Sequence, residues 1–292
     1  MANLKDIRTR INSVKTTRQV TSAMKMVSAA KLKKAQDDIS HIRPYTSRLA
    51  SIIHDLNSSL DDDISCAYTD EKKEGKILIL VVASNRGLCG AFNTNAVKET
   101  QTMIQGMLKD EYKNGEVVVG VMGKQAEKML KSRGIRIEFE FNDLIQAPAF
   151  SKTKEVAQLL MSGFTERKYK RIYLVYNEFA NAAVQKIQAY QYLPFSIPKL
   201  EATSHRSHYM LEPDANSIIS ALIPEMLQAM LFQALLESQA SEHGARMTSM
   251  HKATDNASEL IRDLQLSYNK ARQTAITNEI IEVTGGADAL SG

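Results

Sequence analysis

The segment of this chain most suited to chemistry runs from Ser84 to Asn93 and reads SNRGLCGAFN. It follows an apolar run and precedes a helical pattern, and a glycine-containing turn between a strand and a helix can hold a phosphate with its backbone N–H groups. The segment contains neither G-x-G-x-x-G nor the P-loop sequence, so a tight strand-to-helix turn is the favoured interpretation. Cys89 as a nucleophile would need a paired base, and no histidine lies near it in the sequence.

Metal ligation and acid–base catalysis have few candidate residues. His205 and His208 have ligand-like spacing, but no acidic or sulfur partner lies close to them. The acidic run at 61–63 is interpreted as a solvated linker. Cys66 and Cys89 are too few for a disulfide framework, and we expect reduced thiols. No paired carboxylates or catalytic triad stand out, so we expect a non-enzyme with no catalytic residues, no metal and no cofactor.

The elements that would position the Ser84–Asn93 turn belong to an α/β pattern. Continuous apolar runs that alternate with helical patterns predict a mostly parallel sheet with helices packed on it. The apolar runs lie at 76–83, 117–122 and 171–176, and the helical patterns at 93–108, 124–132 and 152–167. Two further segments, 135–141 and 184–192, alternate more strictly and are expected to be edge strands.

The N-terminal region predicts one long helix. From Asn3 to Leu60 it contains no glycine and one proline, Pro44, which should kink the helix. Apolar residues recur at steps of three and four, with breaks between Val14 and Val20 and around Lys31. The apolar seam expected from this spacing consists of Leu4, Ile7, Ile11, Val14, Val20, Met24, Val27, Ala35, Ile39, Ile42, Leu49, Ile53, Leu56 and Leu60.

A second long helix is predicted from near Asp214 to about Thr284, with Gly285–Gly286 as its stop. Its most regular seam is Met250, Thr254, Ala257, Ile261, Leu264, Tyr268, Ala271 and Ala275. We therefore predict an α/β fold class: a long antiparallel coiled coil of N- and C-terminal helices plus a central Rossmann-like α/β domain with a mostly parallel sheet. The expected domains are residues 1–60, 61–212 and 213–292.

Charge is unevenly distributed along the chain. The net charge is +4, yet nearly every charged residue up to Gln36 is basic, with Asp6 as the one acid. A solvated helix face, a nucleic-acid surface and a contact with an acidic protein all fit this pattern. Because no aromatic residue lies among these basic residues, the segment has no platform on which single-stranded nucleic acid could stack. The bases are Lys5, Arg8, Arg10, Lys15, Arg18, Lys25, Lys31, Lys33 and Lys34.

Membrane and targeting signals are not evident in the sequence. We identify no apolar run close to the ~20 residues that a membrane span needs. The first residues, MANLKDIRTR, contain no apolar stretch typical of a secretory signal.

Three segments make the sequence specific. They are IRTRINSVKTTRQVTSAMKMVSAAKLKKAQ at 7–36, SNRGLCGAFN at 84–93, and the stretch from Ser241 to Leu290 that contains ARM, ATDNA and YNKARQ. Together they resemble, nearly residue for residue, the gamma subunit of the F-type (bacterial-type) ATP synthase. That family usually has Asp in place of Asn85.

The resemblance implies the central rotor shaft of the synthase, which couples ion-driven rotation of the membrane c-ring to ATP synthesis or hydrolysis at the beta subunits. It implies alpha, beta and epsilon subunits and the c-ring as partners, a proton or sodium ion as coupling ion, and a peripheral location at the cytoplasmic face of the bacterial cell membrane. It implies no nucleic acid and no direct membrane insertion. A basic coiled-coil protein that binds nucleic acid or acts as an adaptor, and a nucleotide-binding enzyme, are the alternatives.

The resemblance also implies roles for individual residues. Contacts with beta fall on Met24, Lys25, Lys270, Arg272, Gln273 and Thr277. The tip of the shaft, which turns in an apolar bearing, corresponds to Ile280, Ile281, Val283 and Leu290. Contacts of the foot with the c-ring fall on Arg43, Tyr45, Tyr209, Met210 and Glu212.

Overall fold

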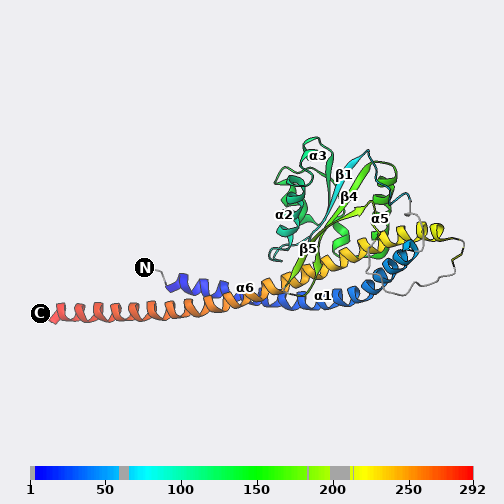
Figure 1. Ribbon diagram of the computed structural model, residues 1–292. Helices are drawn as coiled ribbons and strands as arrows, with labels where there is room; N and C mark the ends of the chain where they lie inside the picture. Colours follow the sequence, from blue (N-terminus) through cyan, green and yellow to red (C-terminus); the bar gives the residue numbers. More distant parts are fainter. Residues whose placement is uncertain (1–3, 59–65, 183, 198–210, 213, 292) are drawn as a thin grey trace. The chain divides into compact units, whose positions relative to one another are not determined.

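The computed structural model describes residues 4–58, 66–182, 184–197, 211–212 and 214–291 (Figure 1). The elements follow in the order α1 (Leu4–Ser58), β1 (Lys76–Val82), α2 (Phe92–Gln105), α3 (Lys109–Lys113), β2 (Val117–Met122), α4 (Lys124–Lys131), β3 (Ile137–Glu140), the 3-10 helix η1 (Asn142–Ile145), α5 (Phe150–Thr165), β4 (Tyr169–Phe179), β5 (Gln185–Leu193) and α6 (Ala215–Ser291). The predicted fold class is confirmed, since two long helices flank an α/β region in the chain.

The sheet has the strand order β3-β2-β1-β4-β5. All neighbours are parallel except β4 and β5, which are antiparallel, and the two alternating segments are the edge strands as predicted. In β1, Leu78 and Leu80 belong to one apolar cluster, whereas Ile77 and Ile79 belong to another. Because both faces of β1 are buried, its sequence is a continuous apolar run rather than an alternating one.

Different helices cover the two faces of the sheet (Figure 1). One apolar cluster joins the sheet to α2 and α4, through residues such as Val97 and Leu130. The other joins the sheet to α5, to the second half of α1 and to the first part of α6, through residues such as Phe164, Ile53 and Leu227. This arrangement places α6 against the sheet and brings it within reach of the strand ends.

The chain forms two compact units. Residues 29–246 form one unit, and residues 1–28 together with 247–292 form the other. In the larger unit, α1 and α6 are antiparallel, because Arg43 bonds Glu237 and Thr46, further along α1, bonds the earlier Gln233. In the smaller unit the two helices also run in opposite directions, and α6 continues past the start of α1 (Figure 1).

The seam of α1 differs from the predicted one between Val14 and Leu32. Val20 and Val27 are exposed, at 53% and 57%, so both lie off the seam. Thr21 and Ser28 are buried instead. Buried or half-buried residues recur at steps of three and four from Thr21 to Leu32, so the predicted break around Lys31 is absent, whereas the predicted break after Val14 is present because residues 15–20 are all exposed. A search for apolar residues missed three seam positions that carry polar side chains, Thr21, Lys25 and Ser28.

The surroundings of α6 change along its length. From Met226 to Arg246 most residues are buried all round, as expected of a core helix. Beyond Met247 a single stripe is buried or half-buried, and it follows the predicted seam from Met250 to Ala271. Ala275, the last predicted seam residue, is exposed.

The predicted stop of α6 is wrong, because the helix continues through Gly285 and Gly286 to Ser291. A glycine in a helix costs about 1 kcal/mol relative to alanine, but it keeps its backbone N–H and leaves the hydrogen-bond ladder intact. Pro44 lies inside α1, which is helical from Leu4 to Ser58, and the kink expected there stays a prediction.

By length and composition alone, α6 is the one helix in the described ranges apolar enough to cross a membrane. The stretch 216–236 contains one charged residue, Glu225. The prediction that no apolar run approaches the length of a membrane span is therefore wrong. Half of the most apolar stretch of α6 is buried within the protein, and the core helix of a soluble protein can be equally long and apolar.

Candidate functional site

The Ser84–Asn93 turn lies at the carboxyl end of β1, where the chain continues to β2 on one side while β4 pairs on the other. This reversal is the point at which doubly wound sheets bind ligands. Here Ser84 N–H donates to Asn93 Oδ1 at 2.9 Å, and Lys124 N–H, just after the end of β2, donates to Asn85 Oδ1 at 3.0 Å. One donor at each strand end is therefore bound to an asparagine side chain of the turn itself.

A second asparagine, Asn142, forms hydrogen bonds at the end of β2. Gly123 N–H donates to Asn142 Oδ1 at 2.9 Å, and the amide of Asn85 donates to the Asn142 carbonyl at 2.7 Å. Gly123 has φ +121°, and a Cβ there would collide with the carbonyl oxygen of Ala83. Glycine is thus required for the close approach of the β1 and β2 ends.

Arg246 of α6 fills the remaining space beside the turn. Its guanidinium donates to the carbonyl oxygens of Arg86, at 3.0 Å, and Gly87, at 3.3 Å. It also pairs with Glu242 one helical turn earlier at 2.7 Å, and both side chains are only 9% exposed. The turn therefore accepts a guanidinium through its carbonyl groups, which is the opposite polarity to an anion site.

The groups next to this ion pair have shifted titration. Burial, the positive Arg246 and the positive Lys31 together lower the pKa of His243 to about 4. Burial raises the pKa of the Glu242 carboxyl, and Arg246 opposes that rise. Burial also raises the pKa of Cys89, which lies beside Ser84 in the turn. A raised thiol pKa is the wrong direction for a nucleophile, so the turn has a packing role.

A second arginine–glutamate pair lies five residues earlier on α6. Arg43 Nε of α1 donates to Glu237 Oε1 at 2.9 Å, and Arg43 Nη2 donates to the carbonyl of Phe179 at 3.0 Å. Phe179 is the last residue of β4, the neighbour of β1 in the sheet. Two arginines, Arg43 and Arg246, therefore bind main-chain carbonyls at the carboxyl ends of adjacent strands.

Sequence reasoning missed both pairs. The available signal was the presence of Glu237, Glu242 and Arg246 in a stretch of α6 that is otherwise largely apolar or small. Charges in such a stretch have to be paired when the helix is buried. The spacing of four residues could have predicted the Glu242–Arg246 pair. Arg43 and the Arg86 carbonyl could not be read from the sequence as partners, because they are far away along the chain.

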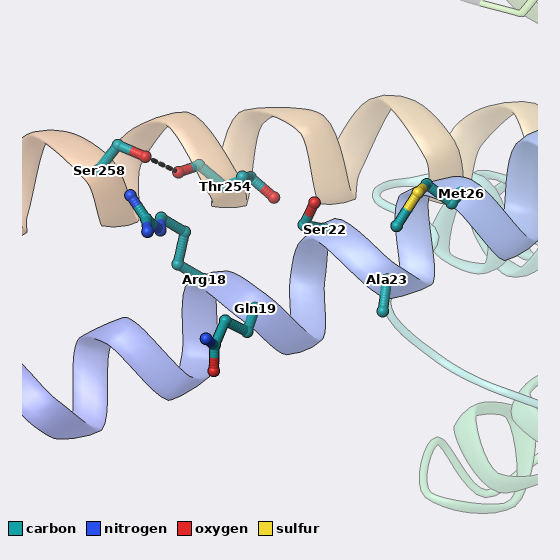
Figure 2. Close-up of a pocket in the computed structure, with 7 residues that line it drawn as sticks. All are labelled: Arg18, Gln19, Ser22, Ala23, Met26, Thr254 and Ser258. Atoms are coloured by element: carbon teal, nitrogen blue, oxygen red, sulfur yellow. Dashed lines mark hydrogen bonds between the residues drawn. The ribbon is translucent and has the colours of Figure 1, made fainter.

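The paired helices of the smaller unit form a shallow groove lined by Arg18, Gln19, Ser22, Ala23, Met26, Thr254 and Ser258 (Figure 2). Figure 2 shows Arg18 and Ser22 pointing toward α6, whereas Gln19 and Ala23 point away from it. Met24 and Lys25, the predicted beta contacts on α1, are half-buried beside this groove.

The other predicted contact residues lie on the exposed surface of α6. Lys270, Arg272, Gln273 and Thr277 are exposed, and the Thr277 hydroxyl donates to the Gln273 carbonyl of its own helix at 2.9 Å. The predicted tip residues Ile280, Ile281 and Val283 are 57%, 60% and 67% exposed. The side chain of Leu290 lies outside the described part of the structure.

The predicted foot residues are only partly described. Tyr45 is 49% exposed, and Glu212 is exposed. Arg43 makes the two internal bonds given above, with 43% of its side chain exposed. Tyr209 and Met210 lie outside the described residues, as do His205 and His208.

The fold and the filled strand ends define a helical connector protein, in which an α/β domain is inserted between two paired terminal helices. A family model described as ATP synthase matches residues 3–290. The ATP synthase gamma chains of Christiangramia forsetii and Flavobacterium johnsoniae are 47% and 46% identical to this chain, over 100% of both chains in each case. The chain therefore belongs to the gamma-subunit family of the ATP synthases, whose members are non-catalytic stalk subunits.

Solved structures share the fold at lower identity. A chain of the Euglena gracilis mitochondrial ATP synthase in rotational state 3 has a TM-score of 0.69 and 23% identity, covering 98% of this chain and 94% of that one. A rotor chain of the same enzyme in rotational state 1 has a TM-score of 0.64 and 23% identity, covering 94% and 98%. This likeness extends to the long helices as well as to the sheet.

Proposed function

We propose that this chain is the central shaft of a bacterial-type ATP synthase and couples ion-driven rotation of a c-ring to ATP synthesis or hydrolysis at the beta subunits. The observation that carries the proposal is the end of α6, which continues beyond its pairing with α1 and exposes Ile280, Ile281 and Val283. Exposed apolar residues grouped in this way are typical of a protein contact. Full-length identity of 46–47% to ATP synthase gamma chains supports the same role.

Asymmetry explains how such a shaft works. Two unequal helices cannot have threefold symmetry, so they touch three chemically equal beta subunits differently. Each orientation then favours a different affinity state at each catalytic site, which is a coupling free energy between shaft and site. The shaft itself supplies no catalytic group.

We assign the contacts with beta to two exposed or half-buried groups. Met24 and Lys25 lie on α1 within the basic stretch, which suits an acidic lever on beta. Lys270, Arg272, Gln273 and Thr277 lie on α6 near the end of the paired region. Exposed charge pairs are worth roughly 0–1 kcal/mol each, so they can exchange as the shaft turns.

We assign the remaining partners to the α/β domain and its surroundings. Epsilon and the c-ring contact this foot, with Tyr45 and Glu212 among the exposed residues on it. The chain then lies peripherally at the cytoplasmic face of the cell membrane, without inserting α6, and binds no nucleic acid. Salt-sensitive retention on DNA would contradict this assignment.

Variants of the assembled complex test the proposal. The chain is co-expressed with the alpha and beta subunits of its source, and Arg272→Ala and Gln273→Ala are compared with Arg262→Ala, an exposed arginine on the same helix. The two test variants should lower ATPase turnover more than they lower assembly, and Arg262→Ala should change neither. Failure of the unaltered chain to form a complex would overturn the proposed function, and unchanged turnover would remove Arg272 and Gln273 from it.

A further inference from the structure

Arg43 connects three elements of the larger unit. Its Nε binds Glu237 of α6 at 2.9 Å, and its Nη2 binds the carbonyl of Phe179 at the end of β4 at 3.0 Å. Arg43 itself belongs to α1, so a single side chain joins both long helices to the sheet. The exposed part of this side chain, 43%, leaves the guanidinium at the edge of the network.

Glu237 is the buried centre of this network, because its side chain is only 2% exposed. Its Oε1 accepts from Arg43 and also from Gln233 Nε2 at 2.9 Å, and Gln233 in turn accepts from the Thr46 hydroxyl at 2.6 Å. Its Oε2 is buried without a hydrogen-bond partner. A carboxylate buried so deeply depends on its cation, so Arg43 is needed to keep the network together.

Two aromatic residues of the sheet lie close enough to this carboxylate to be influenced by its charge. Tyr176 of β4 and Tyr190 of β5 pack edge to face with ring centroids 6.0 Å apart. Burial first, and the negative Glu237 among the nearby charges, raise the pKa of both phenols. Because the Glu237 side chain is 2% exposed, its carboxylate is not part of the surface of this chain.

We propose that Arg43 is a positioning residue for coupling, which clamps α1 and α6 through Glu237 to the carboxyl end of β4 so that rotation of the α/β domain reaches both helices without slip. This inference rests on the proposed shaft function and adds a joint to it. It differs from a direct contact of Arg43 with the c-ring, because the clamp acts entirely within the chain.

Arginine suits this joint better than lysine. The planar guanidinium offers donors in a fixed fork, so one side chain binds a carboxylate and a main-chain carbonyl at the same time. A lysine at position 43 would keep the charge but could not hold both acceptors in that geometry. Arg43→Lys should therefore restore only part of what Arg43→Ala loses.

The experiment compares ion uptake with ATP hydrolysis in inverted membrane vesicles that contain the assembled complex. The variants are Arg43→Ala, Arg43→Lys, Glu237→Gln and the double variant Arg43→Ala/Glu237→Gln. Arg48→Ala is the matched control, since Arg48 is an exposed arginine of α1 that makes no hydrogen bond or ion pair within the described residues. The readout is ion uptake per ATP hydrolysed, which a general loss of folded complex leaves unchanged.

Arg43→Ala should lower the ratio by at least about fivefold, the lower end of typical coupling effects. Glu237→Gln should lower it in the same direction, and the double variant should be no worse than Arg43→Ala, because the two residues act as one unit. A silent Glu237→Gln would overturn the clamp and assign Arg43 to a contact outside the chain. An unchanged ratio in Arg43→Ala would also overturn it. If Arg43→Ala fails to assemble, Glu237→Gln and the double variant decide, whereas failure of the unaltered chain to assemble concerns the shaft function alone.

Discussion

The hydroxyl oxygens of Thr21 and Thr254 lie 2.9 Å apart between α1 and α6. The buried Thr21 hydroxyl donates to the Arg18 carbonyl of its own helix at 3.0 Å, whereas the single Thr254 proton has two acceptors, Thr21 Oγ1 and the Met250 carbonyl at 2.7 Å. A polar pair inside an apolar seam fixes the register of two helices at a cost in stability. Thr21 is followed by two further polar seam positions, Lys25 and Ser28, where apolar packing would define the register poorly.

Replacing both hydroxyls by methyl groups should separate stability from register. In Thr21→Val/Thr254→Val the free energy of unfolding should stay within about 1 kcal/mol of the original or rise, because both partners become apolar together. Urea unfolding of the full chain, followed by circular dichroism, measures this change. Thr9→Val is the control, since Thr9 is exposed and bonds only the Lys5 carbonyl. A loss of unfolding free energy well above that of the control would show that the threonine pair stabilises the two helices rather than fixing their register.

The corrected seam makes a separate prediction for two apolar residues of α1. Ile11 is 8% exposed and Val20 is 53% exposed. Ile11→Ala should therefore lower the free energy of unfolding by about 2 kcal/mol or more. Val20→Ala should change it by less than about 0.5 kcal/mol. Equal losses in urea unfolding would support the apolar seam through Val20 instead.

Local pattern was sufficient to predict much of the fold. The runs at 76–83, 117–122 and 171–176 were predicted as strands because residues buried on both faces leave a continuous apolar sequence. The seam of α1 was misplaced at Val20 and Val27 because apolar type outweighed strict spacing. A count of three and four residues back from Leu32 would have placed Ser28 and Thr21 correctly.

The site was harder to predict, because its bonds join residues that are distant in sequence. Nothing near Arg43 in the chain indicates Glu237, and the acceptor on β4 is a backbone carbonyl that every residue possesses. The turn at Ser84–Asn93 was placed correctly between a strand and a helix. The contact of its carbonyl groups with Arg246 depends on the path of α6, which the sequence pattern does not define.

Arg246 gives a stability prediction of its own. Arg246→Ala leaves Glu242 buried without its cation and should cost about 3–5 kcal/mol of unfolding free energy. Adding Glu242→Gln should recover much of that loss, because the unpaired charge is removed. Urea unfolding of both variants measures the effect, with the exposed Arg262→Ala as control. No recovery in the double variant would mean that the carbonyl contacts of Arg246, rather than the ion pair, dominate.

His243 predicts a dependence of stability on pH. Its pKa is about 4 in the folded chain, against about 6.5 for an ordinary histidine. As pH falls from 6.5 to 4, the His243 imidazole binds a proton in the unfolded chain but stays neutral in the folded chain. The free energy of unfolding therefore falls by up to about 3 kcal/mol.

The raised pKa of Glu242 acts in the opposite direction, because the folded chain then binds a proton more tightly than the unfolded one. The difference between the original chain and His243→Gln isolates the histidine. That difference should change with pH between 6.5 and 4. A flat difference for His243→Gln would contradict a neutral buried imidazole.

The end of α6 gives the prediction that separates the isolated chain from the assembly. Ile280 and Ile281 are 57% and 60% exposed, so Ile280→Ala/Ile281→Ala should change the unfolding of the isolated chain by less than about 0.5 kcal/mol. In the assembled complex the same variant should lower ATPase turnover, since the removed surface would lie against the surrounding subunits. Ile261→Ala is the matched control with the reverse pattern, because Ile261 is 6% exposed within the seam and its loss destabilises the chain itself. Should Ile280→Ala/Ile281→Ala destabilise the isolated chain as strongly as Ile261→Ala does, these side chains pack within the chain and are not the surface of a bearing.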